Sequence, residues 1–177
     1  VSGDVGANVA PGTGKAIVWD AGADWPGQYS TAVRVKVTAD DNYNPPLPPD
    51  PATVAPAVSN GVVTIIGQST AFLYTGANPI QTGVASGTIS AVQVAVLRGR
   101  ALTRAGEPLS GVTVAINNHP EFGQTLTRTN GQYDMAVNGG GILHLNFSKN
   151  GYLPVQRTYD VPWQDFLAVD DVVMISS

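Results

Sequence analysis

From residue 92 onward, apolar and polar side chains alternate in short segments that are separated by turns rich in glycine. A period of two is the pattern of a β-strand with one buried face. The residues expected to face inward include Val112, Val114, Ile116, Tyr133, Met135, Val137, Leu143, Leu145 and Phe147. Asn130-Gly131 is a strong short signal for a turn between two hairpin strands. Residues 92–177 are therefore predicted to form seven strands of a β-sandwich.

The first 43 residues show two further strand signals, at Lys15–Asp20 and Thr31–Thr38. In the second, Val33, Val35 and Val37 share one face. Two or three strands cannot bury enough apolar area to be stable alone. Residues 1–43 are therefore predicted to be a partial β-sandwich segment that needs a partner surface.

Between these halves lies a stretch of different composition. Residues 44–56 hold six of the thirteen prolines, so residues 44–58 are predicted to be an extended, semi-rigid linker. Such a stretch could also bind an SH3-like partner, but a linker is the favoured interpretation. Residues 59–91 are expected to contain short strands at Val62–Ile66 and Ala71–Tyr74, followed by irregular chain.

Composition supports an all-β class and excludes several functions. Charged residues make up only 12% of the chain, against 20 glycines and 13 prolines. The net charge of −4 and the scattered basic residues argue against nucleic-acid binding. No apolar run approaches the ~20 residues that span a bilayer, so membrane insertion is not expected. The absence of cysteine excludes disulfides, thiolate catalysis and cysteine-based zinc sites.

Four segments carry a resemblance to a known family: Arg98–Ala101, Gly106–Val114, Thr127–Tyr133 and Lys149–Tyr152. Together they resemble the carboxypeptidase regulatory-like domain. The resemblance covers roughly residues 92–175 and implies a transthyretin-like sandwich of seven strands. It implies little about function.

A narrower resemblance concerns the context of that domain. Asn118–Thr125, Asn138–Gly141, Val161–Asp165 and Phe72–Gln81 resemble the region that precedes the shell of bacterial RHS/YD-repeat proteins. Residues 3–41 resemble the second half of an immunoglobulin-like domain of secreted bacterial proteins. These resemblances imply a scaffold module at the bacterial cell surface or in a secreted protein.

Catalysis would require convergent polar groups, and the chain offers two histidines, His119 and His144. A catalytic or metal site would form only if both approached one carboxylate. His119 is expected in a loop and His144 on the outer face of a strand, so surface histidines are the favoured interpretation. No catalytic, cofactor-binding or metal-binding residue is assigned, and the chain is not expected to be an enzyme.

Some other residues admit both a functional and a structural interpretation. Asp20, Asp24, Asp40 and Asp41 could hold Ca²⁺, although Asp residues at strand ends more often form Asx-turns. Asp170 and Asp171 are expected to flank the last strand. Asn146-Phe147-Ser148 matches a glycosylation sequon, interpreted as a chance match. Trp163 and Tyr159 could stack on a sugar, but Trp163 is expected to be anchored on the core.

The sequence therefore predicts a non-catalytic structural module that contacts other domains of a parent protein or neighbouring copies. One alternative is an adhesion module that binds glycan or protein. Another is the building block of an extracellular filament, in which the incomplete segment 1–43 receives strands from a neighbouring copy.

Overall fold

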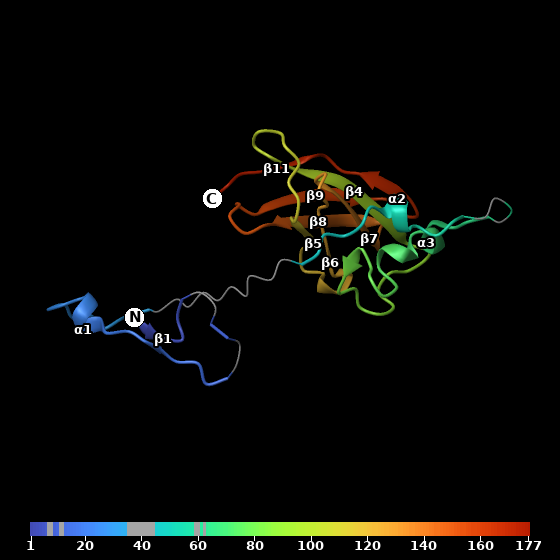
Figure 1. The fold of residues 1–177 in the computed structure, drawn as a ribbon. Coiled ribbons are helices and arrows are strands. Elements are labelled where there is room, and N and C mark those ends of the chain that lie inside the picture. Colours follow the sequence, from blue (N-terminus) through green and yellow to red (C-terminus); the bar gives the residue numbers. More distant parts are fainter. Residues whose placement is uncertain (7–8, 11–12, 35–44, 59–60, 62) are drawn as a thin grey trace. The chain divides into compact units, whose positions relative to one another are not determined.

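The computed structural model of the chain describes residues 1–6, 9–10, 13–34, 45–58, 61 and 63–177. The chain divides into two compact units, Val1–Tyr43 and Asn44–Ser177 (Figure 1).

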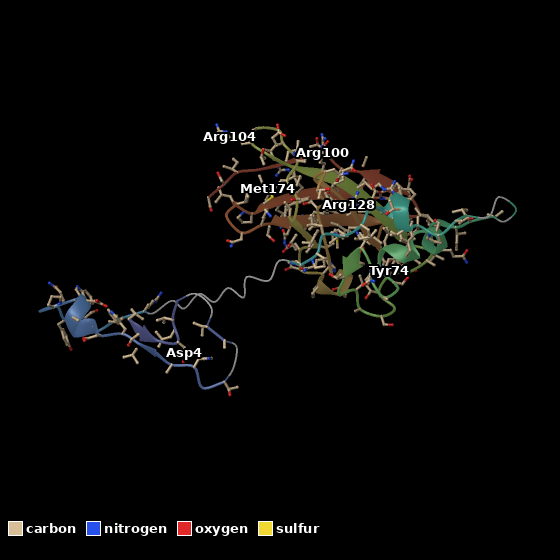
Figure 2. The ribbon with its side chains drawn as sticks, in the orientation of Figure 1. Asp4, Tyr74, Arg100, Arg104, Arg128 and Met174 are labelled. Atoms are coloured by element: carbon tan, nitrogen blue, oxygen red, sulfur yellow. The ribbon has the colours of Figure 1, made fainter. Side chains whose placement is uncertain are left out.

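The first unit contains little regular structure among its described residues. β1 (Ser2–Gly3) pairs antiparallel with β2 (Ile17–Val18), and α1 (Ala21–Asp24) is a single helical turn. Asp4, labelled in Figure 2, fastens this region because its carboxylate accepts hydrogen bonds from Lys15 Nζ and the Ala16 amide. The strand expected at Lys15–Asp20 is confirmed only over its two central residues. Residues 31–34 of the expected Thr31–Thr38 strand form no strand, and residues 35–38 lie outside the described part of the chain.

The second unit is a β-sandwich of two sheets. The larger sheet contains, in spatial order, β3 (Gln81–Thr82), β6 (Gln124–Leu126), β5 (Thr113–Ile116), β8 (Gly141–Ser148) and β9 (Val155–Val161), all antiparallel to their neighbours. The smaller sheet is built on β4 (Val94–Thr103), with β7 (Gln132–Asn138) antiparallel on one edge and β10 (Phe166–Ala168) and β11 (Val172–Met174) parallel on the other. Because β10 and β11 occupy one edge in turn, residues 92–177 fill seven strand positions. The predicted all-β, transthyretin-like sandwich is confirmed.

The space between the sheets is filled by the alternating apolar residues of both (Figure 2). Leu145 and Phe147 are completely buried, whereas His144, the residue before Leu145, is exposed. The predicted inner face of this strand is therefore correct. The Tyr133 ring meets the Phe147 ring edge to face at 5.7 Å between centroids, a favourable arrangement for aromatic pairs.

The Asn130-Gly131 turn forms, but it does not connect a hairpin. Gly131 has a φ of +76°, and Asn130 Oδ1 accepts a hydrogen bond from the Gln132 amide. The turn joins β6 of the larger sheet to β7 of the smaller one, so the chain crosses the sandwich here. The predicted turn at Asn130-Gly131 is confirmed. The pairing of the strands on either side of it is decided by the packing of the two sheets.

A lead-in segment (residues 63–91) covers the outer face of the β4–β7 pair. It contains α3 (Ile66–Ser69) and the 3₁₀ turn η1 (Ala71–Leu73), so the strands predicted at Val62–Ile66 and Ala71–Tyr74 are wrong. A second apolar cluster joins the segment to the sheet and consists of Leu73, Ile80, Val94, Val96 and Ala136. Val62 lies outside the described residues, and Val63, Thr64 and Ile65 are exposed. The second run is buried chiefly through Leu73, which packs on the outer face of the β4–β7 pair.

The remaining helix, α2 (Pro51–Val54), lies inside the predicted linker. Asp50 caps it by accepting a hydrogen bond from the Ala52 amide, and Pro51 occupies the first turn, where its ring favours a helix. Pro51 is buried, so this part of the stretch is not the extended spacer that was predicted. In the part of the chain that the structure describes, no helix has the length and apolar character needed to cross a membrane.

Candidate functional site

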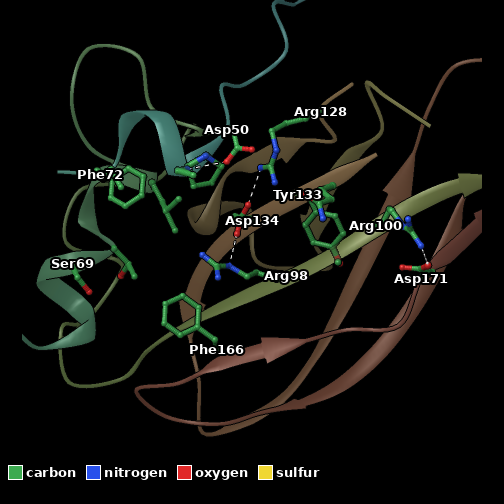
Figure 3. A pocket seen from close by; sticks show the side chains of 17 residues that line it. Asp50, Ser69, Phe72, Arg98, Arg100, Arg128, Tyr133, Asp134, Phe166 and Asp171 are labelled. Carbon is green, nitrogen blue, oxygen red and sulfur yellow. Dashed lines mark hydrogen bonds and ion pairs between the residues drawn. The ribbon is translucent and has the colours of Figure 1, made fainter. Parts of the chain in front are cut away.

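A groove of about 670 Å³ lies on the outer side of the β4–β7 pair (Figure 3). Strands β4 and β7 provide its floor, α2 and the lead-in segment provide one wall, and β10 provides the other. The side chains that matter for its chemistry are those of Asp50, Phe72, Arg98, Arg100, Arg128, Asp134, Phe166 and Asp171. The volume falls in the range of ordinary ligand sites.

The floor of the groove holds a buried ion-paired network. Asp134 accepts a hydrogen bond from Arg98 Nε at 2.6 Å and another from Arg128 Nη1 at 2.8 Å. Arg98 and Asp134 stand directly opposite each other across β4 and β7, so the strand register brings them together. Asp134 is 3% exposed and Arg128 is 7% exposed. A charge buried to this degree is tolerated only beside an opposite charge. Asp134 and Arg128 are each other's partner in this sense.

Arg98 is held in a second way, by an aromatic ring. Its guanidinium carbon Cζ lies 4.5 Å from the centroid of Phe166 on β10. The stacking and the bond from Nε to Asp134 fix the plane of the guanidinium. The two terminal nitrogens of Arg98 donate no hydrogen bond to any other described residue. About half of this side chain is exposed, which leaves those nitrogens accessible from the groove.

The far end of the groove is bounded by a second ion pair. Arg100 Nη2 donates to Asp171 Oδ2 at 2.6 Å, and both side chains are well exposed. The hydrogen bond to Asp171 raises the pKa of Arg100, whose guanidinium is charged in any case. Exposed pairs of this kind contribute little to stability, so this pair mainly defines the edge of the groove.

Beneath the groove, Tyr133 covers a glycine in the neighbouring strand. Gly99 pairs with Tyr133, and a Cβ atom added to Gly99 would lie 2.8 Å from Tyr133 Oη and in contact with Val169. Burial, followed by the nearby Tyr159 and Asp134, raises the pKa of the Tyr133 hydroxyl far above its usual value. Within the described part of the chain, the Tyr133 hydroxyl and Arg128 Nε are buried here without a hydrogen-bond partner.

The wall formed by the lead-in segment is fastened by Gln81, whose side chain is fully buried. Its Nε2 donates to Phe122 O at 2.7 Å and to Ala136 O at 2.9 Å, and its Oε1 accepts from the Ala136 amide at 2.7 Å. Asn138 adds two bonds, accepting from the Ser90 amide and donating to Thr88 O. The Gln81 amide therefore bonds the edge of β7 at Ala136 as a neighbouring strand would, and the Asn138 side chain ties β7 to the lead-in segment.

The two histidines make separate contacts outside the groove. His119 Nδ1 lies 2.8 Å from Glu121 Oε1, and this hydrogen bond lowers the pKa of Glu121. His144 Nδ1 lies 2.8 Å from Thr158 Oγ1 on β9. Both side chains are exposed. Among the described residues, the two histidines do not share a carboxylate partner.

The acidic residues considered for calcium have structural contacts where they are described. Asp20 caps α1, and Asp24 Oδ2 accepts from Trp19 Nε1 at 2.8 Å. Asp40 and Asp41 lie outside the described residues. Over the described ranges, no group of three or more His, Cys, Asp or Glu side chains could hold a metal ion. Asp170 and Asp171 directly precede β11.

Trp163 and Asn146, the remaining candidate binding residues, make contacts that the sequence did not indicate. Trp163 is 60% exposed and lies on the backbone of Gly139–Gly140, where its Nε1 donates to Gly139 O at 2.8 Å. The prediction that it is anchored on the core is wrong, because the indole fits outside the core in the space that the missing Cβ of Gly140 leaves. Asn146 donates to Asn117 Oδ1 and accepts from Gln156 Nε2, so the amide of the sequon is already bonded.

The network of Arg98, Arg128 and Asp134 was not found from sequence. A signal existed, because Arg98 and Asp134 both occupy outward positions in alternating segments and are opposite in charge. Recognising the pair requires knowledge that β7 is the neighbour of β4, and that neighbourhood is not local in sequence.

Comparison with known proteins gives one family for this half of the chain. Residues 89–174 match the family model described as the teneurin TTR-like domain. Teneurin-3 of Danio rerio is 32% identical over 127 residues, which are 72% of this chain and 4% of that protein. Teneurin-m of Drosophila melanogaster is 41% identical over 90 residues, which are 51% of this chain and 3% of that protein. The solved structure titled "The Bacillus anthracis TIE protein" gives a TM-score of 0.40 at 16% identity, covering 48% of this chain and 17% of that one.

The matched region coincides with the sandwich, and the chain spans 4% and 3% of the lengths of these two curated relatives. The transthyretin-like fold is therefore confirmed by sequence relationship as well as by structure. The carboxypeptidase regulatory-like and immunoglobulin-like resemblances and the bacterial YD-repeat context stay predictions, since the relatives named here are animal proteins.

Proposed function

We propose that this chain is a non-catalytic structural module of a larger secreted or cell-surface protein. The proposal starts from the match of residues 89–174 to the teneurin TTR-like domain. In this role the chain contacts other domains of that protein or neighbouring copies. The relatives support the proposal, because the matched region is a small module within very long proteins.

The observation that carries the proposal is that the buried polar side chains are bonded to backbone groups or to ion-pair partners within the sandwich. Gln81 bonds three backbone groups across the two sheets, and Thr127 bonds Leu109 O and the Val112 amide. Asp134 is saturated by two arginines. Each of these groups holds the architecture together. Catalysis requires polar groups that are free to meet a substrate.

The finer part of the proposal concerns the neighbours of the module. Teneurins are related to the RHS/YD-repeat proteins. A position beside a β-shell of that kind fits the resemblances at Phe72–Gln81 and Val161–Asp165. In this interpretation the sandwich is a rigid spacer, and its exposed surfaces, including the free edge of β9, meet the adjacent domains.

A second candidate is an adhesion module that binds glycan or protein. The exposed ring of Trp163, held over Gly140 and hydrogen-bonded to Gly139 O, favours it because aromatic rings stack on apolar sugar faces. Ligand-induced change of tryptophan fluorescence across a glycan panel, with Trp163→Ala as control, tests this candidate. The filament alternative rests on Val33, Val35 and Val37, and the last two lie outside the described residues.

Hydrogen exchange tests the structural proposal. The exchange of each amide is measured in the isolated chain and in the longer protein that contains it. We expect contiguous patches of surface amides on the sandwich to exchange at least about tenfold more slowly in the longer protein. Equal exchange rates at every amide would show that the module makes no stable contact and would refute the proposal.

A further inference from the structure

The terminal nitrogens of Arg98 form a donor pair that is fixed in place before any ligand arrives. Nε is bound to Asp134, and the face of the guanidinium lies on Phe166. A guanidinium held in this way keeps two parallel N–H donors in the geometry that matches one carboxylate. Because little side-chain freedom remains to be lost, binding at this point has a low entropic cost.

Electrostatics in the groove favour a single carboxylate over a polyanion. The lining contains three arginines and three aspartates, so the groove as a whole has no net charge. The excess positive charge is local, because Asp134 is shared between Arg98 and Arg128. Asp171 is paired with Arg100, and Asp50 caps α2. Recognition would therefore depend on a directed hydrogen bond at Arg98.

The surroundings of this donor pair are apolar. Phe166 stacks on the Arg98 guanidinium, and Pro51, Phe72 and Leu73 also line the groove. Figure 3 shows the rings of Phe72, on the lead-in segment, and Phe166, on β10, among the side chains around Arg98. A ligand whose carboxylate meets Arg98 would therefore place a neighbouring apolar group against these rings.

The shape of the groove selects the class of ligand. It is open along the surface, and its lining runs from Asp50 at the start of α2 to the Arg100–Asp171 pair. An extended peptide fits such an open groove, in which consecutive side chains reach an apolar wall and a charged anchor.

We propose that this groove binds an extended peptide segment of a neighbouring domain or protein, which presents an Asp or Glu side chain beside an apolar residue. Arg98 is the anchor for the carboxylate, and Phe166 and Phe72 contact the apolar side chain. This inference deepens the proposed structural function, on which it rests, by naming the chemistry of one contact surface.

Peptide titration followed by NMR tests the proposal with the whole chain. The probe is the capped peptide acetyl-Ala-Phe-Asp-Leu-amide, and its matched control carries Asn in place of Asp. We expect the Asp peptide to shift the Arg98 Nε–H signal and the amides of Gly99, Asp134 and Phe166. We expect the Asn peptide to bind about tenfold more weakly, since a charged hydrogen bond contributes more than a neutral one. Acetate alone distinguishes a small anion from a peptide and should bind far more weakly than the Asp peptide.

Three variants locate the binding. Arg98→Gln should weaken binding of the Asp peptide about tenfold. Arg104→Gln, which removes an exposed arginine of the turn after β4, should change it less than about twofold. Phe166→Ala keeps the charge of Arg98 but removes its stacking partner, so it should weaken binding by a smaller factor. Dispersed amide spectra confirm that each variant is folded, and Phe166→Ala serves in place of Arg98→Gln if that variant does not fold.

Several results would overturn the inference. They are equal affinity for the Asp and Asn peptides, equal affinity for acetate, shifts confined to residues outside the groove, and no shift at about 10 mM peptide. Slower exchange of other surface amides in the longer protein would then still support the structural function, so the two proposals fail separately.

Discussion

Gln81→Leu is predicted to be the most damaging polar-to-apolar change in the lead-in segment. The substitution keeps the approximate volume of the side chain and removes its amide. Gln81 is fully buried and makes three hydrogen bonds to backbone groups, two of them to Ala136. The Val96 amide, opposite Ala136, bonds Asp165 O on the other edge of β4, so the N–H and C=O of Ala136 point away from β4. In the variant these groups would have no partner and no water.

The magnitude follows from the number of groups left unpaired. A buried donor or acceptor without a partner costs about 1–3 kcal/mol. The Ala136 amide has one hydrogen and loses its bond completely, whereas the two carbonyls lose one bond each. The expected loss in free energy of unfolding is therefore about 3–5 kcal/mol. Gln68→Leu is the matched control, because Gln68 is exposed on α3 in the same segment, and it should change stability by less than about 0.5 kcal/mol.

Urea denaturation followed by circular dichroism gives the stability of each variant. Hydrogen exchange at the Ala136 amide gives the local effect, because this amide should be among the slowest in the wild-type sandwich and should become much faster in Gln81→Leu. A loss below about 1 kcal/mol, together with an unchanged Ala136 exchange rate, would refute the view that Gln81 replaces a strand at the edge of β7.

Further predictions concern the core and the floor of the groove. Leu145→Asp should lower the free energy of unfolding by several kcal/mol because Leu145 is completely buried, whereas His144→Asp on the exposed face should be tolerated, as thermal denaturation will show. Gly99→Ala should cost about 1–3 kcal/mol in urea denaturation, because the new methyl group would collide with Val169 and Tyr133. Tyr133→Phe should leave stability at pH 7 unchanged or raise it by about 1 kcal/mol, since it removes a buried hydroxyl without a partner. Burial raises the pKa of Tyr133 in the folded chain above its ordinary value of about 10. Above that pH the unfolded chain loses this proton while the folded chain keeps it, so the free energy of unfolding falls as pH rises. Tyr133→Phe removes this effect, and its free energy of unfolding should therefore fall less steeply above about pH 10.

The sandwich was predictable because its strands obey local rules. In β8, Leu145 and Phe147 alternate with His144 and Asn146, and one face is buried as the alternation requires. The turns are marked by glycines such as Gly131, whose positive φ another residue would adopt only with strain. Pattern and turn chemistry agree there, so the sequence alone indicates both the strands and the buried face.

The lead-in segment could not be predicted in the same way. Its apolar residues are too few to show a helical period, and short apolar runs are ambiguous between helix and strand. Leu73 and Ile80 find their environment only on the outer face of β4 and β7. Gly67 allows the close approach, because a Cβ there would lie 2.8 Å from Ala91 Cα and its carbonyl oxygen. The segment is shaped by packing on a distant surface.

The groove depends on the same non-local information. Arg98, Arg128 and Asp134 are separated by up to 36 positions along the chain and meet because β7 pairs with β4. The Asn130-Gly131 turn suggested β6 as the partner of β7. A β6–β7 hairpin does not place Asp134 opposite Arg98, so the turn signal alone does not predict this network.

The split edge of the smaller sheet has a consequence for synthesis of the protein. β4 ends at Thr103, but the strands that cover its second edge begin only at Phe166. While the intervening residues are translated, β4 presents an uncovered edge that can pair with other chains. At ordinary ribosomal rates this interval lasts on the order of several seconds. A ribosome that pauses between β9 and β10 would prolong that exposure, and a chaperone that binds extended apolar segments would have its main target in β4.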